Sequence, residues 1–345
     1  MKFHQNALRT LLMALPLALA GCNTIVMNPA GDIAAQQGHL IVVSTLLMML
    51  IIVPVIGLTL WFAWRYRASN TEATYTPDWD HSTQLELLIW GAPLLIIIAL
   101  GLVTWISTHT LDPYRPLRRL DAQRPLTADV QPIDVEVVAL DWKWLFIYPE
   151  QGIATVNELA APVDRPIRFH ITASTVMNSF YIPALAGQIY AMPGMQTTLN
   201  AVINHTGEFE GLSANYSGAG FSNMRFKFHA LSDAGFTQWV TTAKASPLAL
   251  ERANYLELEK PSVKAPLVRY GTVAHDLFAA VVDRCVDTTH MCASQMMAID
   301  EAGGLGRGGV RGVSTQDSST EQNRLLARPY VKAEVCAPRR QPIAN

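Results

Sequence analysis

Two long stretches without charged side chains constrain the fold of this chain more than any other feature. Residues 33–64 contain no Asp, Glu, Lys or Arg, and a second run without them covers residues 87–111. About 20 consecutive apolar residues span the hydrocarbon core of a bilayer. A buried helix of a soluble protein is the alternative, but two runs of this length argue against it. We therefore predict transmembrane helices at residues 40–64 and 87–111, joined by a cytoplasmic loop at residues 65–86.

The N-terminus has the layout of an export signal. Lys2 and Arg9 precede a short apolar segment, and small residues then precede Cys22. This order of a basic, an apolar and a small-residue region is that of a secretory signal peptide. Its end resembles the lipobox of bacterial lipoproteins, in which the cysteine after the cleavage site carries a lipid. We expect a signal peptide at residues 1–21 and lipidation of Cys22; an ordinary signal peptide with a chance cysteine is the alternative.

The signal peptide also decides the predicted orientation in the membrane. Counting basic residues does not decide it, because Arg65 and Arg67 lie between the two predicted helices while further arginines follow the second one. Cleavage before Cys22 leaves a periplasmic N-terminus at residues 22–39, and two crossings return the rest of the chain to that side. We therefore expect a multi-pass protein of the bacterial inner membrane with a large periplasmic part.

Composition agrees with membrane segments joined to a folded domain. Half of the 345 residues are hydrophobic and only 16% are charged, which is unusual for a soluble protein. The formal net charge is −2, whereas proteins that bind nucleic acids carry basic patches. We therefore expect the lipid bilayer as a partner and no nucleic acid.

After a proline-rich linker at residues 112–132, the sequence takes on the pattern of β-strands. Hydrophobic side chains alternate with polar ones at residues 133–137, 167–171 and 224–230, which places them on one face of each strand. Short strands separated by Pro- and Gly-containing turns are typical of an antiparallel sandwich or barrel. We therefore predict a membrane-anchored all-β protein, in which a two-helix hairpin is followed by an antiparallel β-sandwich or barrel at residues 133–231.

The rest of the chain divides into a helical segment and a tail. Residues 232–285 contain helix-like stretches punctuated by prolines, whereas the tail, residues 286–345, becomes rich in Gly, Ser and Arg, so we expect it to be disordered. This part of the chain holds three of the four cysteines: Cys285, Cys292 and Cys336. His290 lies between the first two, so metal binding stays open beside unpaired thiols or a disulfide in an oxidising compartment.

A small, polar loop at residues 213–224 separates two of the predicted strands. Gly218 and Gly220 allow its backbone to turn tightly or to approach another group closely. Most loops of this kind are only turns. The spacing of the residues within this loop becomes informative only through its resemblance to a loop of one known family.

The loop and the two-helix anchor together resemble subunit II of the haem–copper oxidases, which has a cupredoxin-like periplasmic domain. In its copper-bearing members the ligands come from a His-Ser-Trp segment and a Cys-x-Glu-x-Cys-Gly-x-x-His-x-x-Met loop. The residues of this chain at the matching positions are Asn178, Ser213, Asn215, Ser217, Phe221 and Met224. Copper electron-transfer sites need thiolate and imidazole donors, and only the methionine is retained here. The resemblance therefore implies a degenerate copper site that holds no metal.

Loss of these ligands is similar to what is found in one branch, subunit II of the cytochrome bo-type ubiquinol oxidases. The resemblance extends to about residue 285 and includes Trp142, Trp144 and an aromatic-rich segment with Phe236 and Trp239. It implies a respiratory complex that oxidises ubiquinol, reduces oxygen to water and pumps protons, with the haems and copper in subunit I. It implies no cofactor and no catalytic residue in this chain. The implied partners are subunit I and the other oxidase subunits, with no soluble cytochrome c.

Glu86 is the one candidate for a direct part in the activity of such a complex. It lies at the start of the second predicted membrane helix, and an ionisable group near the hydrocarbon is costly unless it is functional or close to water. In the family, a subunit II glutamate at this place lies near the entrance of a proton-uptake channel. The alternative is an interfacial acid at a helix start, where the helix dipole favours a carboxylate.

Two rival functions stay open at this point. A copper-bearing cytochrome c oxidase subunit II would need thiolates at Ser213 and Ser217. A membrane-anchored, cupredoxin-like binding lipoprotein would have no haem-bearing partner. For Trp142 and Trp144, packing is a better interpretation than electron entry, and His170, His205 and His229 have no ligand-like spacing.

Overall fold

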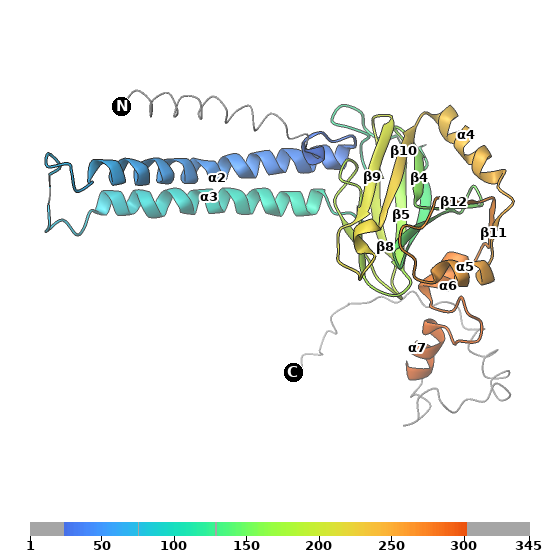
Figure 1. Ribbon diagram of the computed structural model, residues 1–345. Helices are drawn as coiled ribbons and strands as arrows, with labels where there is room; N and C mark the ends of the chain where they lie inside the picture. The colour runs from blue at the N-terminus through green and yellow to red at the C-terminus, as the bar shows by residue number, and fades with distance from the viewer. Residues whose placement is uncertain (1–23, 75, 128–129, 302–345) are drawn as a thin grey trace, which may run out of the picture.

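The computed structural model shows a helical hairpin that projects from one end of a β-sandwich (Figure 1). It describes residues 24–74, 76–127 and 130–301. The predicted signal peptide, Cys22 and Cys336 lie outside the described residues. Figure 1 also shows that the loop between the two long helices lies at the end of the hairpin remote from the sandwich.

The hairpin consists of α2 (Asp32–Arg65) and α3 (Thr83–Thr110), preceded by a short 3-10 helix, η1 (Ile25–Met27). Both long helices are apolar and long enough to cross a membrane, and most of their side chains are exposed in this chain alone. Each begins before the uncharged run that predicted it, because a helix continues through the interface beyond the hydrocarbon core. The exposed apolar surface therefore needs lipid or partner helices around it.

Two packed sheets form the sandwich, and their order is β12-β3-β2-β1-β5-β8 and β4-β10-β9-β6-β7. The strands of the first sheet are β1 (Ile133–Leu140), β2 (Lys143–Tyr148), β3 (Ile153–Val156), β5 (Pro166–Ala173), β8 (Thr197–Val202) and β12 (Val268–Tyr270). Those of the second are β4 (Glu158–Pro162), β6 (Asn178–Tyr181), β7 (Ile189–Ala191), β9 (Gly207–Ser213) and β10 (Arg225–Leu231). The predicted β-sandwich behind a membrane anchor is thus confirmed.

The expectation of purely antiparallel pairing is wrong for two pairs within the sandwich. β1 pairs with β5 in parallel, and β4 pairs with β10 in parallel. The chain leaves the first sheet after β3, passes through β4 in the second sheet and returns as β5. A crossover of this kind brings the returning strand back in the same direction, which a hairpin turn cannot do.

The core lies between the two sheets and is rich in aromatic side chains. Trp144 and Phe146 of β2 are fully buried against Phe180 and Phe226, whose stacked rings lie 5.5 Å apart. At the end of β2, the Tyr148 hydroxyl donates to the Ala160 carbonyl at 2.8 Å. These contacts join the two sheets and account for the aromatic residues that alternate along β2.

The outer face of the first sheet is also covered, by segments that the sequence pattern does not identify. Its apolar side chains, among them Leu145 and Ile147 of β2, pack against the C-terminal helices α5 (Arg252–Glu259) and α6 (Leu277–Val282). A third helix, α4 (Asp233–Lys244), packs on the other side of β2 through Trp239, whose ring lies 5.3 Å from Tyr148. The short strands β11 (Ala249–Leu250) and β13 (Thr272–Val273) pair in parallel beside these helices.

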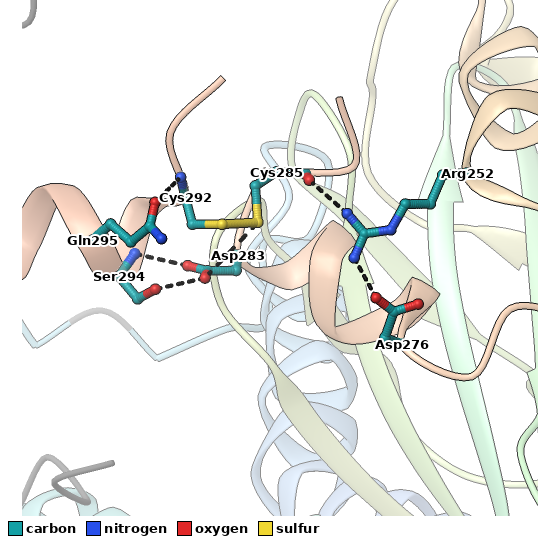
Figure 2. Close-up of a disulfide and its surroundings, with 7 residues drawn as sticks. All are labelled: Arg252, Asp276, Asp283, Cys285, Cys292, Ser294 and Gln295. Carbon is teal, nitrogen blue, oxygen red and sulfur yellow. Dashed lines mark hydrogen bonds and ion pairs between the residues drawn. A yellow bond between two sulfur atoms is a disulfide. The ribbon is translucent and has the colours of Figure 1, made fainter. Parts of the chain in front are cut away.

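The segment directly after α6 is ordered, so the expectation of disorder from residue 286 is wrong up to Glu301. Cys285 and Cys292 form a disulfide, and helix α7 (Ala293–Glu301) follows it. Figure 2 shows that Asp283 lies beside the disulfide and accepts hydrogen bonds from the backbone and hydroxyl of Ser294, at 2.7 and 2.6 Å. Closing so short a loop with a disulfide stabilises it by about 2–3 kcal/mol in the chain-entropy model.

Candidate functional site

The first two positions of the degenerate copper site are in direct contact. Asn178 begins β6 and Ser213 ends β9, two strands that pair antiparallel. The Ser213 hydroxyl donates to Asn178 Oδ1 at 3.1 Å, and Asn178 Nδ2 donates to the Val176 carbonyl at 3.1 Å. Both side chains are nearly inaccessible, with 2% and 1% of their surface exposed. Two neutral side chains therefore satisfy each other where the copper-bearing relatives have a thiolate and an imidazole.

The loop that follows Ser213 is packed against the ring of Trp142. The indole Nε1 donates to the Ser217 carbonyl at 2.9 Å. Gly218 has a φ of +116°, and a Cβ added at Gly220 would lie 2.5 Å from the indole ring. Both glycines are therefore required by the close approach of Trp142, which packs within the domain as expected.

The other four positions of the predicted site differ in their contacts and burial. Asn215 Nδ2 donates to the carbonyls of Met177 and Tyr216, at 3.3 and 3.2 Å. Phe221 lies in the 3-10 helix η2 (Phe221–Asn223), with its ring 5.8 Å from that of Tyr216. Met224 is buried in the hydrophobic core, and the Ser217 hydroxyl is buried without a partner among the described residues. The structure thus gathers the predicted positions around one loop, in which the Ser213 hydroxyl lies within hydrogen-bond distance of both Asn178 Oδ1 and the Asn215 carbonyl, the latter at 3.3 Å.

This set of donors does not fit a dinuclear copper centre. It offers two hydroxyls, two carboxamides and one thioether, whereas electron-transfer copper is held by thiolates and imidazoles. The candidate histidines of the domain are engaged elsewhere or exposed. His170 Nδ1 lies 2.8 Å from Gln196 Nε2, and burial lowers the pKa of its imidazole. His229 Nε2 lies 3.4 Å from a carboxylate oxygen of Glu158.

Glu86 lies in the first turn of α3, at the hairpin end remote from the sandwich (Figure 1). Its Oε1 lies 2.7 Å from His81 Nδ1, and its side chain is 49% exposed. His81 Nε2 in turn lies 3.2 Å from the Thr83 hydroxyl. His81 is an additional residue at this place, and its position five residues before Glu86 puts it within reach of the carboxylate. The pair couples two titratable groups at the surface of the hairpin.

An ion pair with a buried carboxylate, which the sequence pattern does not predict, joins the sandwich to the C-terminal segment. Glu158 of β4, which is 3% exposed, accepts two hydrogen bonds of 2.6 Å from the Arg269 guanidinium of β12. Lys143 of β2 is also buried and donates to the Lys260 carbonyl at 2.8 Å and the Ser262 hydroxyl at 2.6 Å. Burial lowers the pKa of Lys143. These contacts fasten the C-terminal segment to both sheets.

The disulfide decides the open question about Cys285 and Cys292. Together with Asp283 they place three metal-ligating atoms within 4.8 Å of one another. The two sulfurs are bonded to each other, however, so neither is a thiolate. As Figure 2 shows, the Asp283 carboxylate is engaged by Ser294 instead. Of the alternatives that the sequence left open, the structure therefore favours the disulfide.

Two family descriptions match this chain. Residues 134–230 match "Cytochrome C oxidase subunit II, periplasmic domain", and residues 244–289 match "COX Aromatic Rich Motif". The first match covers nearly the whole sandwich, and the second covers the segment that Lys143 and Glu158 of the sandwich hold.

Two similar proteins are named as subunit 2 of a ubiquinol oxidase. The cytochrome bo(3) ubiquinol oxidase subunit 2 of Pseudomonas putida is 53% identical over 78% of this chain and 82% of that protein. The ubiquinol oxidase subunit 2 of Acetobacter aceti is 48% identical over 77% of this chain and 84% of that protein. A solved structure, the periplasmic domain of subunit II of a Bradyrhizobium japonicum cytochrome oxidase, is 26% identical over 34% of this chain and 96% of that chain, with a TM-score of 0.32.

Proposed function

Because this chain belongs to the ubiquinol oxidase subunit 2 family, we propose that it is the copper-free, non-catalytic second subunit of a terminal oxidase. The complex takes electrons from ubiquinol and reduces oxygen to water, with its haems and catalytic copper in subunit I. The observation that carries the copper-free part of the proposal is the Ser213–Asn178 hydrogen bond, which occupies a ligand position with neutral side chains. Relatives of 48–53% identity named for ubiquinol support the choice of electron donor.

The chemistry of the two electron donors explains why copper is dispensable. A water-soluble cytochrome delivers its electron at the periplasmic surface, so its oxidase needs a relay centre in the outer domain. Ubiquinol is lipid-soluble and delivers electrons within the membrane, where such a relay has no role. The sandwich then caps the outer face of the complex, and the two helices pack against partner helices through their exposed apolar surface.

Copurification tests the proposal against both rival functions. A tagged full-length chain should bring down a haem-bearing partner from the inner membrane, and the complex should consume oxygen with ubiquinol as donor. Oxygen consumption with reduced cytochrome c but not with ubiquinol would favour a cytochrome c oxidase. Repeated purification without any haem protein would favour a binding lipoprotein and would contradict the proposal.

We propose in addition that Glu86 contributes to proton entry into the complex. Its carboxylate is half exposed at the loop end of the hairpin and paired with His81, so it can exchange protons with water beside the membrane. We expect Glu86→Gln to slow proton uptake several-fold in the assembled oxidase, since the amide keeps the size of the side chain but does not titrate. Proton uptake is measured in reconstituted vesicles with a pH-sensitive dye.

Glu72→Gln is the matched control. Glu72 is an exposed glutamate of the loop between α2 and α3, whereas Glu86 lies within α3. It should leave proton uptake at the wild-type rate. Unchanged turnover and pumping in Glu86→Gln would show that Glu86 only marks the start of the helix.

Lipidation of Cys22 and a periplasmic sandwich complete the proposal. The lipobox-like end of the signal segment supports both, because cleavage there leaves Cys22 at the new N-terminus. The intact mass of the purified chain should equal that of residues 22–345 plus a lipid. In Cys22→Ser this added mass should be lost, and a wild-type mass without lipid would contradict acylation.

A further inference from the structure

A cavity of about 320 Å³ lies where the two membrane helices meet the sandwich, and we call it the junction cavity. Its walls are the first turns of α2, residues 110–119 after α3, residues 187–188, and the middle of β8. Figure 1 shows the hairpin joining the sandwich at this place. Sites for small organic molecules have volumes of about 300–1,000 Å³. The junction cavity is therefore large enough for a polar headgroup.

The walls of the junction cavity are fixed by hydrogen bonds between the hairpin and the sandwich. The Gly31 amide, just before α2, donates to the Ala184 carbonyl at 3.0 Å. On the opposite side, Asn200 Nδ2 of β8 donates to the Pro113 carbonyl at 3.1 Å. Because both the start of α2 and the segment after α3 are attached to strands or loops of the sandwich, the cavity belongs to the folded domain and not to a loose hinge.

One ion pair within the wall is already satisfied. Asp32 is 5% exposed, and its two carboxylate oxygens accept hydrogen bonds from Arg119 Nε and Nη2 at 2.9 and 3.0 Å. Gln36 Nε2 adds a third hydrogen bond to Asp32 at 2.8 Å. A buried carboxylate of this kind needs its partner. Arg119 therefore belongs to the architecture of the cavity and is not a binding group.

Two further arginines of the wall give the junction cavity its positive charge. Arg115 Nη1 donates to the His109 carbonyl at 3.1 Å, a neutral acceptor. Arg118 is exposed and has no side-chain partner in the part of the chain that the structure describes. Asp112 is the only other acid among the lining residues besides Asp32. Apart from the Asp32–Arg119 pair, the lining residues carry two guanidinium groups and one carboxylate, so the cavity favours an anion.

The depth of the junction cavity in the membrane indicates the kind of anion. The uncharged run of α3 continues to Leu111, which lines the cavity. Trp105 and Ile106, one to two turns earlier, are exposed on the helix surface. The hydrocarbon core therefore ends at the cavity, at the level of the phospholipid headgroups. Apolar surface for acyl chains lies directly beside it.

We propose that the junction cavity binds the phosphate of an anionic phospholipid in the leaflet on the side of the sandwich. Arg115 and Arg118 donate hydrogen bonds to the phosphate oxygens, and the acyl chains lie along α3. A guanidinium group matches a phosphate with two parallel donors, which a single ammonium cannot do. An anionic lipid is favoured over a zwitterionic one because the latter brings its own cation to a basic cavity. This site does not depend on ubiquinol or on copper, so it goes beyond the proposed function.

The full-length chain in detergent, freed of native lipid, tests this proposal by native mass spectrometry. Phosphatidylglycerol, phosphatidylcholine and inorganic phosphate are titrated separately. We expect one phosphatidylglycerol per chain with an affinity above that for phosphatidylcholine. The double variant Arg115→Gln/Arg118→Gln should weaken phosphatidylglycerol binding by roughly 30-fold, since each of the two arginines near a membrane surface contributes roughly 1 kcal/mol. Arg225→Gln, an exposed arginine of β10 outside the cavity, should bind as the wild type does.

Arg118→Gln alone keeps the test valid if the double variant fails to fold, because Arg118 is exposed and its loss leaves no buried group unpaired. It should weaken phosphatidylglycerol binding by several-fold. Equal affinity for the two lipids, or unchanged binding in both variants, would overturn the proposal. Displacement of phosphatidylglycerol by an equal concentration of inorganic phosphate would assign the cavity to free phosphate and would also overturn it.

Discussion

Restoring five ligand residues should turn the colourless loop of this chain into a purple copper centre. The variant carries Asn178→His, Ser213→Cys, Asn215→Glu, Ser217→Cys and Phe221→His. With added copper, the full-length variant in detergent should absorb strongly in the visible range through thiolate-to-copper charge transfer. The wild-type chain should stay colourless under the same conditions, because its hydroxyl and amide groups do not provide the required donors.

The structure gives this result a physical basis. The Ser213 hydroxyl and Asn178 Oδ1 already lie 3.1 Å apart, so a thiolate and an imidazole at these positions can reach one ion. The loop keeps its close packing on Trp142 through Gly218 and Gly220, and Met224 keeps its buried position. The loop is therefore already packed closely enough to support a metal site, and the variant supplies the missing donor side chains.

A four-substitution variant that keeps Ser213 is the matched control. With only one thiolate it should bind copper more weakly and lack the dinuclear spectrum. A purple wild-type chain would show that the copper-free proposal is wrong. A folded five-substitution variant that binds no copper would show that the loop no longer holds ligand geometry. Under the proposed function no electron passes through this loop, so ubiquinol oxidation by the assembled complex should be the same for all three chains.

The positions of the proposed degenerate copper site could be predicted from the sequence because they lie close together along the chain or in a recognisable motif. Ser213 to Met224 is a single loop, and Asn178 precedes a recognisable segment. The hydrogen bond between Ser213 and Asn178 could not be deduced from this pattern, because it depends on the pairing of β6 with β9. Likewise, the period of two along a strand does not distinguish parallel from antiparallel neighbours, so the β1–β5 pair was missed.

The segments that cover the outer face of the first sheet could not be predicted from the sequence, for a related reason. The run Lys143–Tyr148 is almost entirely apolar, which is typical of a strand buried on both faces. Nothing in it says what covers the second face, since α5 and α6 lie more than a hundred residues further along the chain. The disulfide is a similar case, because the spacing of Cys285 and Cys292 allowed several kinds of chemistry.

The second prediction with a large expected effect concerns the stability of the same C-terminal segment. The ion pair between Arg269 and Glu158 fastens this segment to the sandwich. Arg269→Met should lower the free energy of unfolding by about 3 kcal/mol, which corresponds to a fall in Tm of roughly 6–12 °C. The Glu158 carboxylate is 3% exposed and accepts both of its short hydrogen bonds from Arg269. Without the guanidinium it is left as an unpaired carboxylate that is nearly buried, and among the described residues the remaining ion-pair partner is His229, at 3.4 Å. Thermal unfolding of the full-length chain in detergent measures the change.

Arg225→Met is the control, because it breaks an ion pair of similar length on the same sandwich. Arg225 lies 2.8 Å from Glu210, but both side chains are more than half exposed, so this change should cost less than about 1 kcal/mol. The double variant Arg269→Met/Glu158→Met should recover most of the lost stability, since two apolar side chains leave no unpaired charge. If the double variant were as unstable as Arg269→Met alone, the loss would come from packing of β12 and not from an uncompensated carboxylate.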